Sequence, residues 1–262
     1  MKKYELTTDT KFIFGKKYFR IRALVDFGNV SKGDLGGYIE SENNLSNDTK
    51  YGNAWIGGNA RVGGDARVDG NARVDGDAHV AGNARVDGNA RVDGNARVDG
   101  EAYVGGFAYV GGNARVDGEA HIGDLAYVDD EAHIGDLAWV GNNARVGEKA
   151  HVDGRAYVKG NAWIGGNARV GGDARVDGNA RVDGEAYVDS NDCYTTIRGF
   201  GTEFRNTTFF RCEDDKIRVQ CGCFYGDIDE FRKQVKRTRT GKIAKEYLMI
   251  ADLMEYHFGE EK

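Results

Sequence analysis

Residues 83–100 read NARVDGNARVDGNARVDG, so one hexapeptide occurs three times in succession without change. The same register extends in both directions. Alanine occupies every sixth position from Ala54 to Ala186, 23 times, and valine or isoleucine follows each alanine by two residues. No insertion interrupts this period. A strict repeat is the first signal to interpret, because fixed periods identify folds in which repeated units stack on one another.

The order of residues within the hexapeptide predicts a short strand followed by a corner. In an extended A-R-V-D segment, alanine and valine point to one side and arginine and aspartate to the other. Glycine and asparagine tolerate positive φ angles and suit a sharp corner. A single strand of this kind cannot bury its valine, so successive coils have to stack. Three hexapeptides then close a triangular coil, and the repeat predicts about seven and two-thirds coils.

The repeat, read as V-D/G-G-N-A-R, resembles the hexapeptide motif of left-handed parallel β-helix proteins. Residues 20–46, RIRALVDFGNVSKGDLGGYIESENNLS, together with the repeat resemble hexapeptide-repeat proteins of phages and prophages, many of which are labelled acyltransferases from the repeat alone. The left-handed sense of the β-helix is implied by this resemblance. A resemblance of this kind supports an inference about fold more strongly than one about function. We therefore predict a mainly β protein built on a left-handed three-sided parallel β-helix.

Two further segments flank the predicted β-helix of residues 54–190. Residues 1–53 are expected to form a short N-terminal β cap and an irregular first coil. There Ile39, Leu45 and Tyr51 keep the six-residue spacing, one residue out of register with Ile56. Residues 191–262 are expected to form a small α+β module. Its strands are predicted at TTIRGF, TFFRCE and KIRVQCGCFYG, and its helices at 227–239 and 245–258.

Charge and composition bear on the classes of partner. The chain has a formal net charge of −6, and residues 54–190 carry 22 acidic against 14 basic side chains. Such a surface repels nucleic acid and anionic lipid, so we expect neither as a partner. No apolar run approaches the length of a membrane span, and MKKYELTTDTK lacks the apolar core of a secretory signal. We expect a cytoplasmic protein (in the host cytoplasm, if phage-encoded) with reduced thiols at Cys193, Cys212, Cys221 and Cys223.

Aromatic and apolar side chains replace arginine and asparagine at several outward positions between residues 101 and 163. We call this set the aromatic belt and predict it as a binding surface, because monomeric proteins rarely expose large apolar patches. Three interpretations stay open: the subunit interface of a dimer or trimer, a site for a protein partner or ligand, or simple stacking along each column. The belt comprises Tyr103, Phe107, Tyr109, His121, Leu125, Tyr127, Trp139, Tyr157 and Trp163.

Four histidines, His79, His121, His133 and His151, occupy outward positions where arginine is usual. Resemblance to hexapeptide acyltransferases implies a histidine base, acetyl-coenzyme A bound between subunits, and inserted loops that build the acceptor pocket. The present repeat has no inserted loop, so we assign no catalytic residue and no cofactor. His121 and His133 are the candidate bases if the protein is an acyltransferase. Neither the histidine columns nor the four cysteines have the spacing of a closed metal site, and no metal is expected.

The first predicted C-terminal helix carries basic residues at Lys233, Lys236, Arg237 and Arg239. They form either a solvated helix face or a surface for an anionic partner. Taken together, these features favour a non-catalytic interaction or scaffold protein. The resemblance implies a phage accessory or anti-defence factor that binds a host protein. The alternatives are a coenzyme A-dependent acyltransferase acting at a trimer interface and a structural, polymer-forming module.

Overall fold

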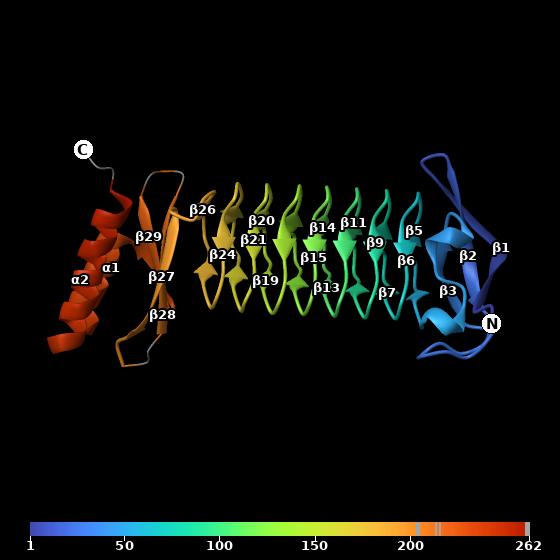
Figure 1. Ribbon diagram of the computed structural model, residues 1–262, viewed down its shortest axis with the longest axis horizontal. Helices are drawn as coiled ribbons and strands as arrows, with labels where there is room; N and C mark the ends of the chain where they lie inside the picture. The colour runs from blue at the N-terminus through green and yellow to red at the C-terminus, as the bar shows by residue number, and fades with distance from the viewer. Residues whose placement is uncertain (203–204, 213, 215, 260–262) are drawn as a thin grey trace.

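The computed structural model describes residues 1–202, 205–212, 214 and 216–259. Figure 1 shows an elongated molecule with the N-terminal strands at one end, a stack of coils in the middle, and a small sheet with two helices at the other end. The central part is a left-handed, three-sided parallel β-helix, as predicted. Within the described residues, no helix has both the length and the apolar character that a membrane span requires.

Each side of the β-helix is one parallel sheet, and the three are called faces 1, 2 and 3. Face 1 comprises β5 (Arg61–Val62), β8 (His79–Val80), β11 (Arg97–Val98), β14 (Arg115–Val116), β17 (His133–Ile134), β20 (His151–Val152), β23 (Arg169–Val170) and β26 (Tyr187–Val188). Face 2 comprises β6 (Arg67–Val68), β9 (Arg85–Val86), β12 (Tyr103–Val104), β15 (His121–Ile122), β18 (Trp139–Val140), β21 (Tyr157–Val158) and β24 (Arg175–Val176). Face 3 comprises β4 (Trp55–Ile56), β7 (Arg73–Val74), β10 (Arg91–Val92), β13 (Tyr109–Val110), β16 (Tyr127–Val128), β19 (Arg145–Val146), β22 (Trp163–Ile164) and β25 (Arg181–Val182).

The coil has the predicted length of three hexapeptides. Arg91 pairs with Tyr109 and Val92 with Val110, one coil further along the chain. The strands are two residues long, shorter than the predicted A-R-V-D segment, because the chain bends at each glycine. Backbone hydrogen bonds nevertheless continue through the corner, where Asn95 N donates to Gly112 O at 2.7 Å. The regular ladder thus covers both strands and corners.

The interior of the β-helix contains the alanines and the β-branched residues of the repeat. From Ala54 to Val188 every repeat alanine and every valine or isoleucine two residues later is at most 1% exposed. Burial of one such valine contributes roughly 1.5–3 kcal/mol. The outward position between them is therefore free to vary in sequence without disturbing the core.

Most corners have glycine in the left-handed region, but five have larger residues at φ 53–58°: Asp124, Asp130, Asp136, Asn142 and Glu148. Their side chains offset part of this strain by accepting hydrogen bonds from the next corner. Asp124 Oδ2 accepts from Asn142 N at 2.9 Å, and Asp130 Oδ2 accepts from Glu148 N at 3.0 Å. These corners occur in the part of the β-helix that carries the aromatic belt.

The N-terminal segment covers the first coil. Strands β1 (Tyr4–Ile13), β2 (Lys16–Ala23) and β3 (Leu35–Ile39) extend face 1, and β3 pairs with β5 in parallel. Short 3-10 helices follow at Glu42–Asn44 and Thr49–Tyr51. Ile39 and Leu45 enter the core as their spacing suggests, whereas Tyr51 is exposed.

The C-terminal module caps the other end. Its antiparallel sheet comprises β27 (Tyr194–Phe200), β28 (Arg205–Arg211), β29 (Ile217–Cys221) and β30 (Phe224–Asp227), and helices α1 (Ile228–Thr238) and α2 (Gly241–Phe258) follow. Phe210 is buried in the β-helix core, and its neighbour Phe209 packs with the helices. The sheet therefore lies between the last coil and the two helices (Figure 1).

Two sequence predictions for this module need correction. The single strand predicted over 216–226 is a hairpin, because Gly222 adopts a φ of 62° and reverses the chain between β29 and β30. Helix α2 begins at Gly241, four residues before the predicted Lys245. Glu213, the last residue of the strand predicted at TFFRCE, lies outside the described residues.

Candidate functional site: the aromatic belt

A column of stacked rings follows face 2. The ring centroids of Tyr103 and His121 lie 4.6 Å apart, those of His121 and Trp139 6.0 Å, and those of Trp139 and Tyr157 4.3 Å. The interplanar angles of these three pairs are 32°, 21° and 16°. Four successive coils thus present one continuous stack, and its residues are those that the six-residue spacing placed in one column.

Face 3 carries a shorter stack. Tyr109 and Tyr127 are stacked with centroids 4.7 Å apart, and Arg145 occupies the next coil. Trp163 lies beyond that arginine, where the guanidinium of Arg181 stands 4.1 Å from its ring centroid. Trp163 is consequently separated from the tyrosine pair and has a cationic neighbour. The stacked part of the predicted belt ends on this face at Tyr127.

Glycine follows many of these rings by two residues, and the sequence analysis did not recognise its role. A Cβ placed on Gly105 would lie 2.4 Å from Tyr103 Oη, and one on Gly141 would lie 2.0 Å from Trp139 Cη2. The rings therefore lie over the glycine of their own coil. The detectable signal was that glycine replaces the usual aspartate two residues after five of the eight outward tyrosines and tryptophans, as in Tyr109–Gly111 and Trp163–Gly165.

Exposed apolar side chains border face 2 at both corners. Phe107 and Leu125 follow the face and are 64% and 59% exposed. Leu137, which the sequence analysis missed, precedes Trp139 at the opposite corner and is 50% exposed. The corner column of Phe107 and Leu125 is occupied by asparagine in the coils before and after this pair, where Asn143 Nδ2 donates to Asn161 Oδ1 at 3.2 Å. Phe107 and Leu125 therefore replace part of a hydrogen-bonded asparagine ladder with apolar surface.

Hydrogen bonds hold two of the tyrosines in place. Tyr103 Oη donates to Asp87 Oδ1 at 2.6 Å, and this bond together with burial raises the pKa of Tyr103. Tyr127 Oη donates to Asp129 Oδ2 at 2.8 Å, and this bond is the main reason that the pKa of Tyr127 is raised to about 12. Both phenols stay protonated near neutral pH, and their rings are oriented before any partner arrives.

The first half of the belt lies in a strongly acidic part of the chain, whereas residues 138–163 carry four basic and two acidic side chains. Residues 101–137 contain eight acidic side chains and one basic one, Arg115, a formal balance of −7. Glu101, Glu119 and Glu131 are exposed at corners beside the aromatic columns. An apolar centre with a charged rim is the usual composition of a protein interface. The arrangement also favours cationic partners over anionic ones.

The histidines occupy two different environments. His121 belongs to the ring stack of face 2, where burial lowers its pKa. On face 1, His133 Nε2 lies 2.9 Å from Asp117 Oδ2, and its ring is 5.4 Å from that of His151. The two candidate bases therefore do not share a site. Among the described residues, no three histidine, cysteine or acidic side chains are grouped to hold a metal ion.

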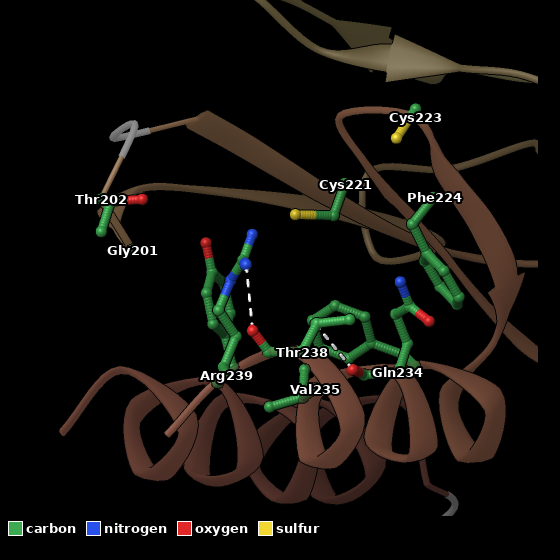
Figure 2. Close-up of a pocket in the computed structure, with 11 residues that line it drawn as sticks. Gly201, Thr202, Cys221, Cys223, Phe224, Gln234, Val235, Thr238 and Arg239 are labelled. Atoms are coloured by element: carbon green, nitrogen blue, oxygen red, sulfur yellow. Dashed lines mark hydrogen bonds between the residues drawn. The ribbon is translucent and has the colours of Figure 1, made fainter. Parts of the chain in front are cut away.

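The C-terminal module contains a cavity of about 110 Å³ between its sheet and α1. Figure 2 shows Cys221 and Phe224 on the sheet side, and Gln234, Val235 and Arg239 on the helix side. Ligand pockets usually measure roughly 300–1,000 Å³, so this cavity is small for an organic substrate. Of the predicted basic residues, Arg239 lies at its rim, while Lys233 and Arg237 line an open groove on the other side of α1. Lys236 is exposed.

Comparisons with known proteins find similarity among solved structures alone. No family model matches the chain, and no curated protein matches it. Among solved structures, one similar chain is an X-ray structure from Bacillus cereus described as a "putative acetyltransferase". It is 11% identical, with 82% of this chain and 99% of that chain covered at a TM-score of 0.23. A likeness of this size does not bear on activity. The unbroken six-residue period and the stacking of its three-sided coils identify the chain as a hexapeptide-repeat parallel β-helix protein.

Proposed function

We propose that this chain is a non-catalytic interaction protein that binds a protein partner through the aromatic belt. The observation that carries the proposal is the exposed apolar surface formed by Phe107, Leu125 and Leu137 around the ordered ring stack of face 2. Exposed patches of this kind mark interaction sites more often than they serve folding. The valine core is complete without them, because outward side chains contribute nothing to it.

The β-helix favours binding because it holds these side chains rigidly. The Trp139 ring, for example, stacks on Tyr157 and lies over Gly141, so it is in contact on two sides. A partner that docks on such a surface pays little entropy for ordering the side chains that it meets. The resemblance of residues 20–46 and the repeat to phage proteins leads us to propose an accessory or anti-defence role in a host cytoplasm.

Three serine substitutions in one column test the proposal. In Tyr103→Ser/Trp139→Ser/Tyr157→Ser, the stack is removed while the inward valines remain. The matched control, Arg67→Ser/Arg85→Ser/Arg175→Ser, changes the same face outside the stack. Proteins that co-purify with the wild-type chain from host extract, quantified by mass spectrometry, should be retained by the control and lost from the stack variant. Equal retention by both variants would exclude the belt as the binding surface.

An acyltransferase is the second candidate function, and one observation favours it. The His133 imidazole is oriented by the Asp117 carboxylate at 2.9 Å, as a general base requires. Isothermal titration with acetyl-coenzyme A separates the two candidates. The interaction proposal predicts no saturable heat up to millimolar ligand. Micromolar binding that weakens in a His133→Gln variant would instead support the acyltransferase.

A further inference from the structure

The chain has a second exposed apolar surface, on the outer side of α2. Met249, Leu253 and Tyr256 are 60%, 55% and 81% exposed. Their spacing of four and three residues places them on one side of the helix, and we call this set the helix stripe. The opposite side of α2, which includes Ile250 and Met254, is buried against the module. The helix stripe therefore faces solvent.

The helix stripe has positive charge at its N-terminal end, while Glu246, Asp252 and Glu255 lie within its own stretch of α2. Residues 231–245 contain seven basic side chains and no acidic one, a formal balance of +7. Lys242 and Lys245 precede Met249 by seven and four residues, so they lie on the same side of the helix as the stripe. Both are exposed. Lys242 and Lys245 thus place positive charge, which the acidic side chains of the belt would attract, next to the apolar stripe of the same chain.

The two surfaces cannot meet within one molecule. The sheet β27–β30 separates α1 and α2 from the last coil, and the belt lies on the middle coils, near β13 and β15 (Figure 1). Because the buried side of α2 faces this sheet, the helix stripe faces away from the β-helix to which it is attached. Contact between the stripe and a belt therefore requires another molecule.

We propose that the occupant of the belt is α2 of a second copy of this chain, an inference that rests on the proposed role of the belt in protein binding. The dimensions agree. The stripe extends about 10 Å at about 1.5 Å per residue, and the ring stack extends about 14 Å at about 4.8 Å per coil. An apolar helix side then covers the exposed rings, and its lysines meet the glutamates at the rim. This combination gives affinity through burial and orientation through charge.

The contact joins two different surfaces, so it is heterologous. A copy whose belt is occupied still presents its own helix stripe to another belt. Association then continues to larger species as concentration rises, unless the arrangement closes into a ring or a reciprocal pair. Because charge guides the contact, the same association should weaken at high salt.

Sedimentation velocity of the full chain, measured against concentration and salt, tests this inference. The wild-type chain should sediment above its monomer mass of 28.7 kDa at high micromolar concentration in low salt. Two charge-reversal variants, Glu101→Lys/Glu119→Lys in the belt rim and Lys242→Glu/Lys245→Glu beside the stripe, should each associate at least about tenfold more weakly. A mixture of the two variants should regain association, because each then supplies the charge that the other lacks.

The corner column that contains Glu101 and Glu119 also supplies the control. Asp65 and Asp173 occupy the same column outside the belt, so Asp65→Lys/Asp173→Lys should associate like the wild-type chain. Thermal unfolding monitored by circular dichroism establishes that each variant is folded. A wild-type chain that stays monomeric at every concentration, or charge variants that associate like wild type, would overturn the second-copy inference. If a monomeric wild-type chain still loses its co-purifying proteins on serine substitution of the stack, the proposed function stands without a second copy.

Discussion

The glycines beneath the stacked rings are needed for packing rather than for a turn. Gly141 is not among the glycines with positive φ, yet a Cβ at this position would overlap the indole of Trp139. Glycines at the corners, such as Gly100 at φ 68°, are in contrast required by the backbone. Glycines at two adjacent positions of the repeat thus serve different purposes.

Gly141→Ala should destabilise the protein, because Trp139 would have to rotate away from Tyr157. We expect a loss of about 1 kcal/mol, the value of one aromatic pair beyond its burial, with a shift in tryptophan fluorescence. Urea unfolding measures the loss. The same substitution in a Trp139→Ser background should have little effect, and an equal loss in both backgrounds would contradict the packing explanation.

Three outward histidines should make stability depend on pH. Burial is the largest cause of a lowered pKa at His79, His121 and His151, and Arg61 and Arg97 add to it at His79. A base with a lowered pKa in the folded state binds its proton more readily when unfolded. Stability is therefore unaffected well above pH 6.5 and falls as the pH decreases from that value toward the lower folded pKa.

Replacement of these histidines by glutamine should remove this pH dependence. The free energy of unfolding of His79→Gln/His121→Gln/His151→Gln should decline less than that of wild type between pH 7 and pH 5. Urea titrations at each pH provide the comparison. Identical slopes for the two proteins would mean that other groups, such as the corner carboxylates, control the acid response.

At the scale of elements, β28 joins two hydrophobic cores through two adjacent residues whose side chains point to opposite sides of the sheet. Phe210 packs into the end of the β-helix, and Phe209 packs against α1, with its ring centroid 6.0 Å from that of Phe231. Because successive side chains of a strand point to opposite faces of the sheet, one short element both closes the last coil and supports the helices.

Truncation of either phenylalanine should therefore loosen a different part of the molecule. Each substitution by alanine removes a buried ring and should cost about 3–5 kcal/mol. Hydrogen exchange should rise in β25 and β26 for Phe210→Ala and in α1 for Phe209→Ala. Exchange that rises in the same peptides for both variants would show that the sheet does not separate two cores.

The elements that could be predicted from the sequence were those under a strict period. The coil length, the inward alanine and valine, and the aromatic column of face 2 all follow from six-residue spacing. Outside the repeat, prediction depended on local propensity. The hairpin at Gly222 was missed, because a strong β pattern runs through both of its strands. Leu137 was missed because it stands alone in its column.

At the scale of the whole molecule, the six-residue repeat determines the shape. The positions at which the outward residues differ from the repeat consensus indicate the functional surface. A regular prism of arginine and aspartate columns would have the same core, and the belt adds nothing to that core. The departures gather in the middle coils, where apolar corners, stacked rings and acidic residues coincide. A second exposed apolar surface, with Lys242 and Lys245 at its N-terminal end, lies on α2 at one end of the molecule.

Photo-crosslinking from one corner column tests the central claim most directly. A benzoylphenylalanine at Leu125 stands in the belt, while the same residue at Asn71 or Asn179 occupies the same column outside it. In host cells, the belt position should crosslink to a protein, either a second copy or another chain, and the two asparagine positions should not. Equal crosslinking at all three positions, or none at Leu125, would contradict the assignment of the aromatic belt as a binding surface.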